Sequence, residues 1–296
     1  MFGSTLLFAL NIPIAKSLLV SGYVHPIGLT VMRFLAATAG FWILSLFMPH
    51  ERIHKADRWK LFFCAILGVS LNQIPFITGL ANTSPVDASI IITLSPVFIM
   101  LISAIVLKEP ITSKKVLGVF LGACGAVLIV TASHHNHAGI SNWWANLLVF
   151  SSTITYASYL VLMKPLTGTY STITLMKWIF LYGTLTSLPF CYQYIYIQSD
   201  ASAITYWCIL YTTVGATFLS YLLVPIALKI LRPTVVGMYN YAQPVIASFV
   251  ALMLGQDFFS WEKPVSLLLV FAGVYFVIIS KSRAQVLAEK AEQGHA

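Results

Sequence analysis

A short polar cluster interrupts a long apolar run in the last quarter of the chain. It reads MYNYAQP and begins at Met238. Tyr239 and Gln243 are four residues apart, so in a helix they share one face. Buried polar groups need partners or water, and tyrosines with amides suit a ligand that has an apolar body and a polar end. We therefore identify Tyr239, Asn240, Tyr241 and Gln243 as candidate substrate-binding residues.

A proline follows this cluster, and another stands in the middle of an earlier apolar run. These are Pro244 and Pro96, the second within SPVDASIIITLSPVFIM. Proline inside a helix removes one hydrogen bond and frees the carbonyl four residues earlier, here that of Asn240 and that of Ile92. We interpret Pro96 and Pro244 as hinge points beside a central cavity. The alternative is a pair of static kinks packed by their neighbours.

The two runs are copies of one another. A constant offset of 148 positions relates Pro85 to Pro233, Pro96 to Pro244, Lys115 to Lys263 and Gly125 to Gly273. The same offset pairs further polar or aromatic residues, and these join the candidate substrate-binding set: Ser95, Asn72, Gln73, Asn11, Tyr159 and Tyr221. Each of them alone could serve only to hold helices together by hydrogen bonds.

Two cations lie inside apolar segments at matching places. TVMRF contains Arg33, and TLMKW contains Lys177, with an offset of 144. We interpret both as reaching the membrane interface or capping neighbouring carbonyls, as we do for Lys16. The alternative is an anion site in each leaflet.

The composition defines the solvent of the elements that carry these residues. The chain is 58% hydrophobic and 9% charged, whereas soluble domains carry about 25% charged residues. A membrane-spanning helix needs about 20 apolar residues. Ten segments qualify, at 2–20, 26–48, 59–79, 86–107, 115–132, 143–163, 171–194, 203–225, 233–254 and 264–281.

The distribution of cations predicts the orientation of these segments. With the N-terminus in the cytoplasm, 13 of the 17 Lys and Arg residues fall in cytoplasmic loops or the tail, as the positive-inside rule expects. Both termini are then cytoplasmic. Five segments is an odd number, so the second copy is inverted. We predict an all-α integral membrane protein with a first repeat at 1–132, a second at 143–281 and a polar tail at 282–296.

The chain resembles the EamA family of the drug/metabolite transporter superfamily over essentially its whole length. The matching stretches are NIPIAKSLL, MRFLAA and LSPVFIMLISAIVLKEPITSKKVLGVFLGACGAVLIV. The second copy departs from the pattern, because QDF stands where the first has KEP. The resemblance implies transport across the inner or cytoplasmic membrane. It does not imply a cargo, since relatives export amino acids and other small metabolites, and distant ones move sugar phosphates or nucleotide-sugars.

These observations predict a carrier rather than an enzyme. Inverted repeats are typical of alternating access, and no nucleophile with a base stands at spanning depth. We expect export of amino acids, with aromatic ones among the candidates; the alternatives are a sugar-phosphate or nucleotide-sugar exchanger and a drug exporter. None of the nine acids or seven histidines falls in the middle of a segment, which favours uniport or exchange over proton coupling.

The remaining expectations concern partners. We predict no cofactor and no metal, and we interpret the run HHNH at His134–His137 as a solvated outer loop. The expected partners are a small-molecule substrate and the lipid bilayer, without nucleic acid. We expect a monomer or a weak homodimer.

Overall fold

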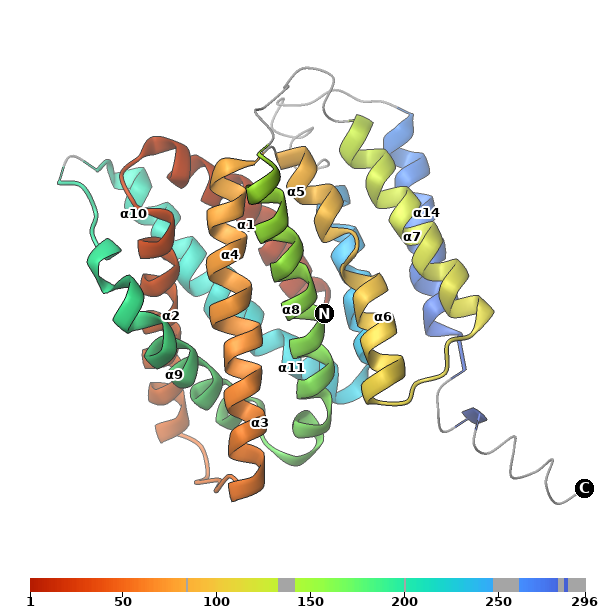
Figure 1. Cartoon of the computed structure of the whole chain (residues 1–296), viewed down its shortest axis with the longest axis horizontal. Coiled ribbons are helices and arrows are strands. Elements are labelled where there is room, and N and C mark those ends of the chain that lie inside the picture. The colour runs from red at the N-terminus through yellow and green to blue at the C-terminus, as the bar shows by residue number, and fades with distance from the viewer. Residues whose placement is uncertain (84, 133–141, 200, 247–260, 282–284, 287–296) are drawn as a thin grey trace, which may run out of the picture.

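The computed structural model is nearly all helical (Figure 1). It describes residues 1–296 except 84, 133–141, 200, 247–260, 282–284 and 287–296, so the HHNH run and most of the polar tail lie outside the described residues. The described part holds one isolated antiparallel bridge, between Val24 and Ile197, and no strand. This agrees with the predicted all-α class.

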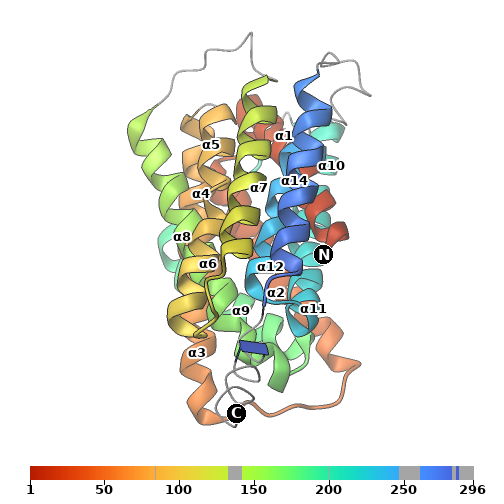
Figure 2. The ribbon, with the colours of Figure 1, turned by 90° about the vertical axis from the view of Figure 1, so that its right-hand side faces the viewer.

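The helices follow one another as α1 (Phe2–Ser21), α2 (Pro26–Leu46), α3 (Lys55–Ala65), η1 (Ile66–Ser70), α4 (Leu71–Asn82), α5 (Pro85–Ile92), α6 (Ser95–Val106), α7 (Ser113–Ala132), α8 (Trp143–Thr169), α9 (Thr172–Cys191), η2 (Tyr192–Tyr194), α10 (Ala203–Leu210), η3 (Tyr211–Leu219), α11 (Ser220–Ile230), α12 (Pro233–Met238), η4 (Tyr239–Tyr241) and α14 (Glu262–Ile278). Figures 1 and 2 show most of them running side by side, roughly parallel to one axis.

Five continuous helical stretches are long and apolar enough to cross a membrane. They are Phe2–Ser21, Pro26–Leu46, Lys55–Asn82, Trp143–Thr169 and Ala203–Ile230. Each matches a predicted segment, although the last three run several residues further than predicted at one or both ends. Large apolar side chains remain exposed on the outside of the bundle, as lipid-facing surfaces require. The protein is therefore a multi-pass membrane protein.

Both proline-containing segments are distorted at the positions that the sequence indicates. The helix before Pro96 ends at Ile92 and restarts at Ser95. The helix before Pro244 tightens into the 3₁₀ turn Tyr239–Tyr241. Proline cannot donate to the preceding turn, so in both segments the distortion falls just ahead of the proline.

Two π-helical stretches occupy equivalent places in the third and eighth predicted segments. They are η1 and η3, and the offset of 148 carries η1 into the middle of η3. A π-helix has i→i+5 hydrogen bonds in place of i→i+4 bonds and is frequent at functional sites. The hydroxyls of Thr217 in η3 and of Ser220 at the start of α11 donate to the carbonyls of Thr212 and Gly215, five residues back.

Charged side chains secure the ends of several helices. Glu109, which follows α6, forms an ion pair of 2.8 Å with the buried Lys115 of α7 and accepts a hydrogen bond of 3.4 Å from Thr234 of α12. Arg232 donates to the last carbonyls of α14, including Val277 at 3.1 Å. Glu109 is thus a helix stop with a cation partner, as predicted.

A close helix contact joins α7 and α14, which lie side by side in both views (Figures 1 and 2). A Cβ added at Gly118 would lie 2.6 Å from the carbonyl oxygen of Gly273, and one added at Gly273 would lie 2.6 Å from that of Gly118. Small residues let helix backbones approach in this way. The glycines are therefore required for the contact.

We predict that Gly273→Ala destabilises the protein by about 1–3 kcal/mol, because the new methyl group must push two backbones apart. Gly168→Ala in α8 is the control, since a Cβ there meets nothing within 4 Å. Thermal unfolding of the purified protein in detergent measures both. An unchanged midpoint for Gly273→Ala would contradict the close approach.

Candidate functional site

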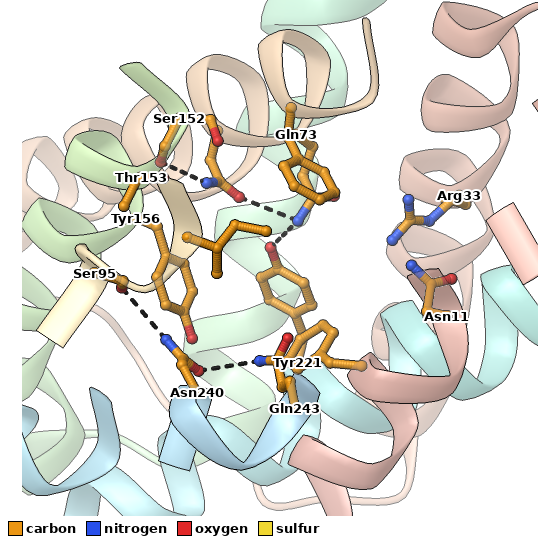
Figure 3. A pocket seen from close by; sticks show the side chains of 14 residues that line it. Asn11, Arg33, Gln73, Ser95, Ser152, Thr153, Tyr156, Tyr221, Asn240 and Gln243 are labelled. Carbon is orange, nitrogen blue, oxygen red and sulfur yellow. Dashed lines mark hydrogen bonds between the residues drawn. The ribbon is translucent and has the colours of Figure 1, made fainter. Parts of the chain in front are cut away.

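A cavity of about 110 Å³ lies between the helices at the point where α5–α6 and α12–η4 are distorted. Fourteen residues line it: Phe8, Asn11, Arg33, Asn72, Gln73, Phe76, Ile92, Ser95, Ser152, Thr153, Tyr156, Tyr221, Asn240 and Gln243 (Figure 3). None of these described residues is acidic. The lining combines amides, hydroxyls and aromatic rings with one cation.

Hydrogen bonds join the polar residues into two groups. In one, Asn240 donates to the Ser95 hydroxyl at 3.3 Å and accepts from Gln243 at 3.2 Å. In the other, the amide of Gln73 donates to the oxygen of Asn72 at 3.2 Å and to the hydroxyl of Tyr221. These bonds fix the orientation of the amides that face the cavity.

The second group is anchored on two backbone carbonyls. Asn72 donates to the carbonyl of Ser152 at 2.8 Å. Tyr221 donates to the carbonyl of Gly68, in η1, at 3.1 Å. The π-helical stretch therefore supplies an acceptor that holds Tyr221, and Tyr221 in turn positions Gln73 at the cavity.

Four pairs of lining residues are related by the 148-residue offset. They are Phe8 with Tyr156, Gln73 with Tyr221, Ile92 with Asn240, and Ser95 with Gln243. Ile92 and Asn240 are also the residues whose carbonyls Pro96 and Pro244 free. Equivalent positions of the two copies therefore meet at one place.

The structure brings seven of the ten candidate residues to the cavity: Asn11, Asn72, Gln73, Ser95, Tyr221, Asn240 and Gln243. Tyr239 and Tyr241 pack instead against Met100 and Val119 in a separate apolar cluster. The Tyr241 hydroxyl donates to the Val119 carbonyl at 3.2 Å. The 3₁₀ turn over 239–241 changes the angle between successive side chains, so the expected shared face of Tyr239 and Gln243 is lost.

Tyr159 also lies away from the lining. Its ring covers Gly68, where an added Cβ would lie 2.4 Å from it. Its hydroxyl is buried and has no hydrogen-bond partner in the part of the chain that the structure describes. Tyr156, one turn earlier on α8, lines the cavity in its place.

Arg33 is the main correction to the sequence interpretation. It does not reach the membrane interface, since its side chain is 2% exposed and lines the cavity. Its Nε donates to the Thr217 hydroxyl at 2.6 Å. Lys177 is buried too, but its Nζ lies 5.3 Å from the centre of the Trp42 ring, and the residue is not in the lining.

Sequence reasoning also missed Phe8, Phe76, Ser152, Thr153 and Tyr156. A usable signal existed for Tyr156 and Ser152, which are four residues apart and share a helix face. Phe8 is the partner of Tyr156 under the offset, but an apolar residue in an apolar segment carries no polar signal.

A family model described as the EamA-like transporter family matches residues 1–131 and 143–279. This chain belongs to the EamA-like transporter family. The match covers both copies and omits only the junction and the tail. The family name and the names of relatives describe transporters rather than enzymes.

Comparison with known proteins places this EamA-like transporter among others of its kind. An "uncharacterized transporter" of Archaeoglobus fulgidus is 33% identical over 168 aligned residues. The aligned part covers 57% of this chain and 58% of that protein, so this chain spans less than two thirds of its length. A "probable terminal-alkyne amino-acid exporter" of Streptantibioticus cattleyicolor is 25% identical over 55% of this chain and 53% of its own length. A solved structure titled "Crystal structure of protein" has a TM-score of 0.75 at 19% identity, covering 98% and 96% of the two chains, and so shares the fold.

We predict that Tyr221→Phe destabilises this EamA-like transporter by about 1–3 kcal/mol, because the buried Gly68 carbonyl and the half-buried Gln73 amide each lose one partner. Tyr159→Phe is the matched control. It removes a hydroxyl that has no partner among the described residues, so we expect stability to be unchanged or slightly raised.

Thermal unfolding in detergent distinguishes the two tyrosines. Equal losses of stability for Tyr221→Phe and Tyr159→Phe would show that the hydroxyl of Tyr221 does not hold the site.

Proposed function

We propose that this chain is a ten-helix carrier. It exports an amino acid with an aromatic or apolar side chain by alternating access. The observation that carries the proposal is the cavity, to which equivalent residues of both copies contribute. A single site on the axis between two inverted halves can open to either side when the halves rock.

The helix contacts support two inverted five-helix repeats. The predicted second and seventh segments pack together as α2 and α9, the fourth and ninth as α6 and α12, and the fifth and tenth as α7 and α14. The contact of α2 with η3 has its counterpart in that of α9 with α3. The contact of α4 with α8 likewise corresponds to that of α1 with η3 and α11. This pattern is the one that a two-fold relation between 1–132 and 143–281 requires.

The cation distribution supports a cytoplasmic location of both termini in the cytoplasmic membrane. Lys164 lies on the proposed cytoplasmic side, where its Nζ donates to the carbonyl of Leu231 at 3.0 Å. Arg232 caps the end of α14 on the same side. Cations that cap helix ends are stabilised by the carbonyls there, and the positive-inside rule places them in the cytoplasm.

The composition of the cavity favours an amino acid over the other cargoes of the superfamily. Phosphate groups call for several cations, whereas Arg33 is the one cation among the described lining residues. The amino-acid exporter among the relatives supports the same choice.

The lining also supports uniport or exchange. No Asp, Glu or His is among the described lining residues. Unperturbed tyrosine titrates near about 10, too high to exchange a proton at neutral pH. The gradient of the substrate itself then drives transport.

Reconstitution in liposomes tests the proposal. With labelled phenylalanine at equal concentration on both sides, we expect an imposed pH gradient to drive no net accumulation. Phenylalanine loaded on the far side should accelerate counterflow of label. Accumulation driven by pH would overturn the energetic proposal, and an absence of counterflow for every aromatic or apolar amino acid would overturn the substrate class.

A second prediction concerns Gln243. Gln243→Ala should impair counterflow because it removes a cavity amide that bonds to Asn240. Ile91→Ala is the control, since Ile91 packs in an apolar cluster with Ala15 and Ile77 and does not line the cavity. The comparison requires equal amounts of folded protein in the membrane. A loss for Ile91→Ala that matches or exceeds that for Gln243→Ala would contradict the assignment.

A further inference from the structure

The cavity contains an electrostatic imbalance at Arg33. In the part of the chain that the structure describes, the hydrogen bond to the Thr217 hydroxyl is the one bond of its side chain, and it uses Nε. The ion pairs of the described residues, Lys60–Asp57 and Lys115–Glu109, do not include it. A guanidinium has four further N–H donors, on its two terminal nitrogens.

Such an arrangement is costly without a counter-ion. Removing a charge from water costs several kcal/mol unless a partner of opposite sign compensates for it. Arg33 is 2% exposed, and no lining residue that the structure describes is acidic. The described lining residues supply no negative charge to Arg33, so a ligand that enters the cavity has to supply it.

The neighbouring elements orient Arg33 for this purpose. The Thr217 hydroxyl donates to the carbonyl of Thr212 at 2.8 Å, so its lone pairs are available to the Nε of Arg33. Thr217 lies in the π-helix η3, five residues after Thr212, and this bond fixes the position of its hydroxyl. With Nε held, the terminal nitrogens remain for a planar acceptor with two oxygens.

Asn11 provides a second unsatisfied group at the same cavity. It is 7% exposed, and its Oδ1 is buried with no hydrogen-bond partner among the described residues. Figure 3 shows Asn11 and Arg33 on one side of the cavity, with Ser95 and Asn240 on the other. A rotation of the Asn11 amide would turn this acceptor toward the cavity beside the cation, where it matches a ligand that carries a positive group next to a negative one.

We propose that Arg33 binds the carboxylate of the transported amino acid and that the Oδ1 of Asn11 accepts a hydrogen bond from its ammonium group. The apolar body of the substrate then lies toward Phe8, Phe76 and Tyr156. This inference rests on the proposed function and adds the orientation of the substrate. A single cation fits a carboxylate of one negative charge better than a phosphate, which calls for more.

Binding to the purified full-length chain in detergent tests this inference without relying on transport. Isothermal titration calorimetry compares phenylalanine and tryptophan with their carboxamides, which keep the ammonium group and the ring but lose the negative charge. We expect the wild type to bind the acids about tenfold to a hundredfold more tightly than the amides, as a hydrogen bond to a charged group provides.

Variants assign the preference to a residue. Arg33→Gln should bring the ratio of acid to amide affinity close to one, whereas Arg33→Lys should keep part of it, because the charge stays and the planar fork is lost. Lys177→Gln is the matched control. It removes one buried cation from the equivalent helix but none from the cavity, so the ratio should persist.

The role of Asn11 is tested with a compound that lacks the ammonium group. Asn11→Ala should weaken the binding of phenylalanine, but not that of 3-phenylpropionate, which has no ammonium group. Equal weakening of both compounds would overturn the role of Asn11.

Each result for Arg33 decides the inference. Amides that bind the wild type as tightly as acids would overturn the carboxylate site and leave the transport proposal standing. If neither acids nor amides bind, the amino-acid assignment and this inference both fail. Should Arg33→Gln not fold, as thermal unfolding would reveal, an unchanged ratio in Arg33→Lys overturns the inference, and a reduced one supports it.

Discussion

The structure depends on one constraint, which is that every backbone polar group within a bilayer must find a partner inside the protein. Regular helices meet it by themselves. Here the helices are irregular at η1, η3, η4 and the gap between α5 and α6, and some of their carbonyls accept hydrogen bonds from side chains. The Tyr221 hydroxyl serves the Gly68 carbonyl in this way. Because these irregularities gather around one cavity, the groups that they free also determine its chemistry.

The same constraint explains the contrast between the two ends of the molecule. Away from the cavity, α7 and α14 approach so closely at Gly118 and Gly273 that no side chain fits between them. Packing of that kind resists deformation. Around the cavity the helices are interrupted by prolines and held by side-chain hydrogen bonds. In the proposed alternating access, these bonds are the ones that exchange partners, while the close contact of α7 with α14 stays rigid.

Much of this arrangement could be predicted from the sequence, since helix length, apolar composition and the proline positions are local properties. The distortions ahead of Pro96 and Pro244 and seven of the ten candidate residues followed from such properties. Tyr239 and Tyr241 did not, because a 3₁₀ turn rotates side chains away from the positions that an ideal helix gives. The π-helical stretches were not predicted either, and η1 packs against a residue far away in the sequence, with the Tyr159 ring over Gly68. The lining role of Arg33 needed the position of Thr217, which is 184 residues away along the chain.

The interpretation of Arg33 failed for a physical reason that applies to other membrane proteins. A cation a few residues inside a helix reaches the interface when its path along the helix surface faces lipid or headgroups. Arg33 cannot do so, because its helix packs against α9 and η3, and its guanidinium is held by a hydroxyl on η3. Lys177, at the equivalent place, finds an aromatic ring instead. One pair of matched cations therefore reaches two environments, so the sequence repeat does not extend to the surroundings of its charges. An asymmetric site of this kind can hold an asymmetric ligand in one orientation, even though equivalent positions of both sequence copies line it.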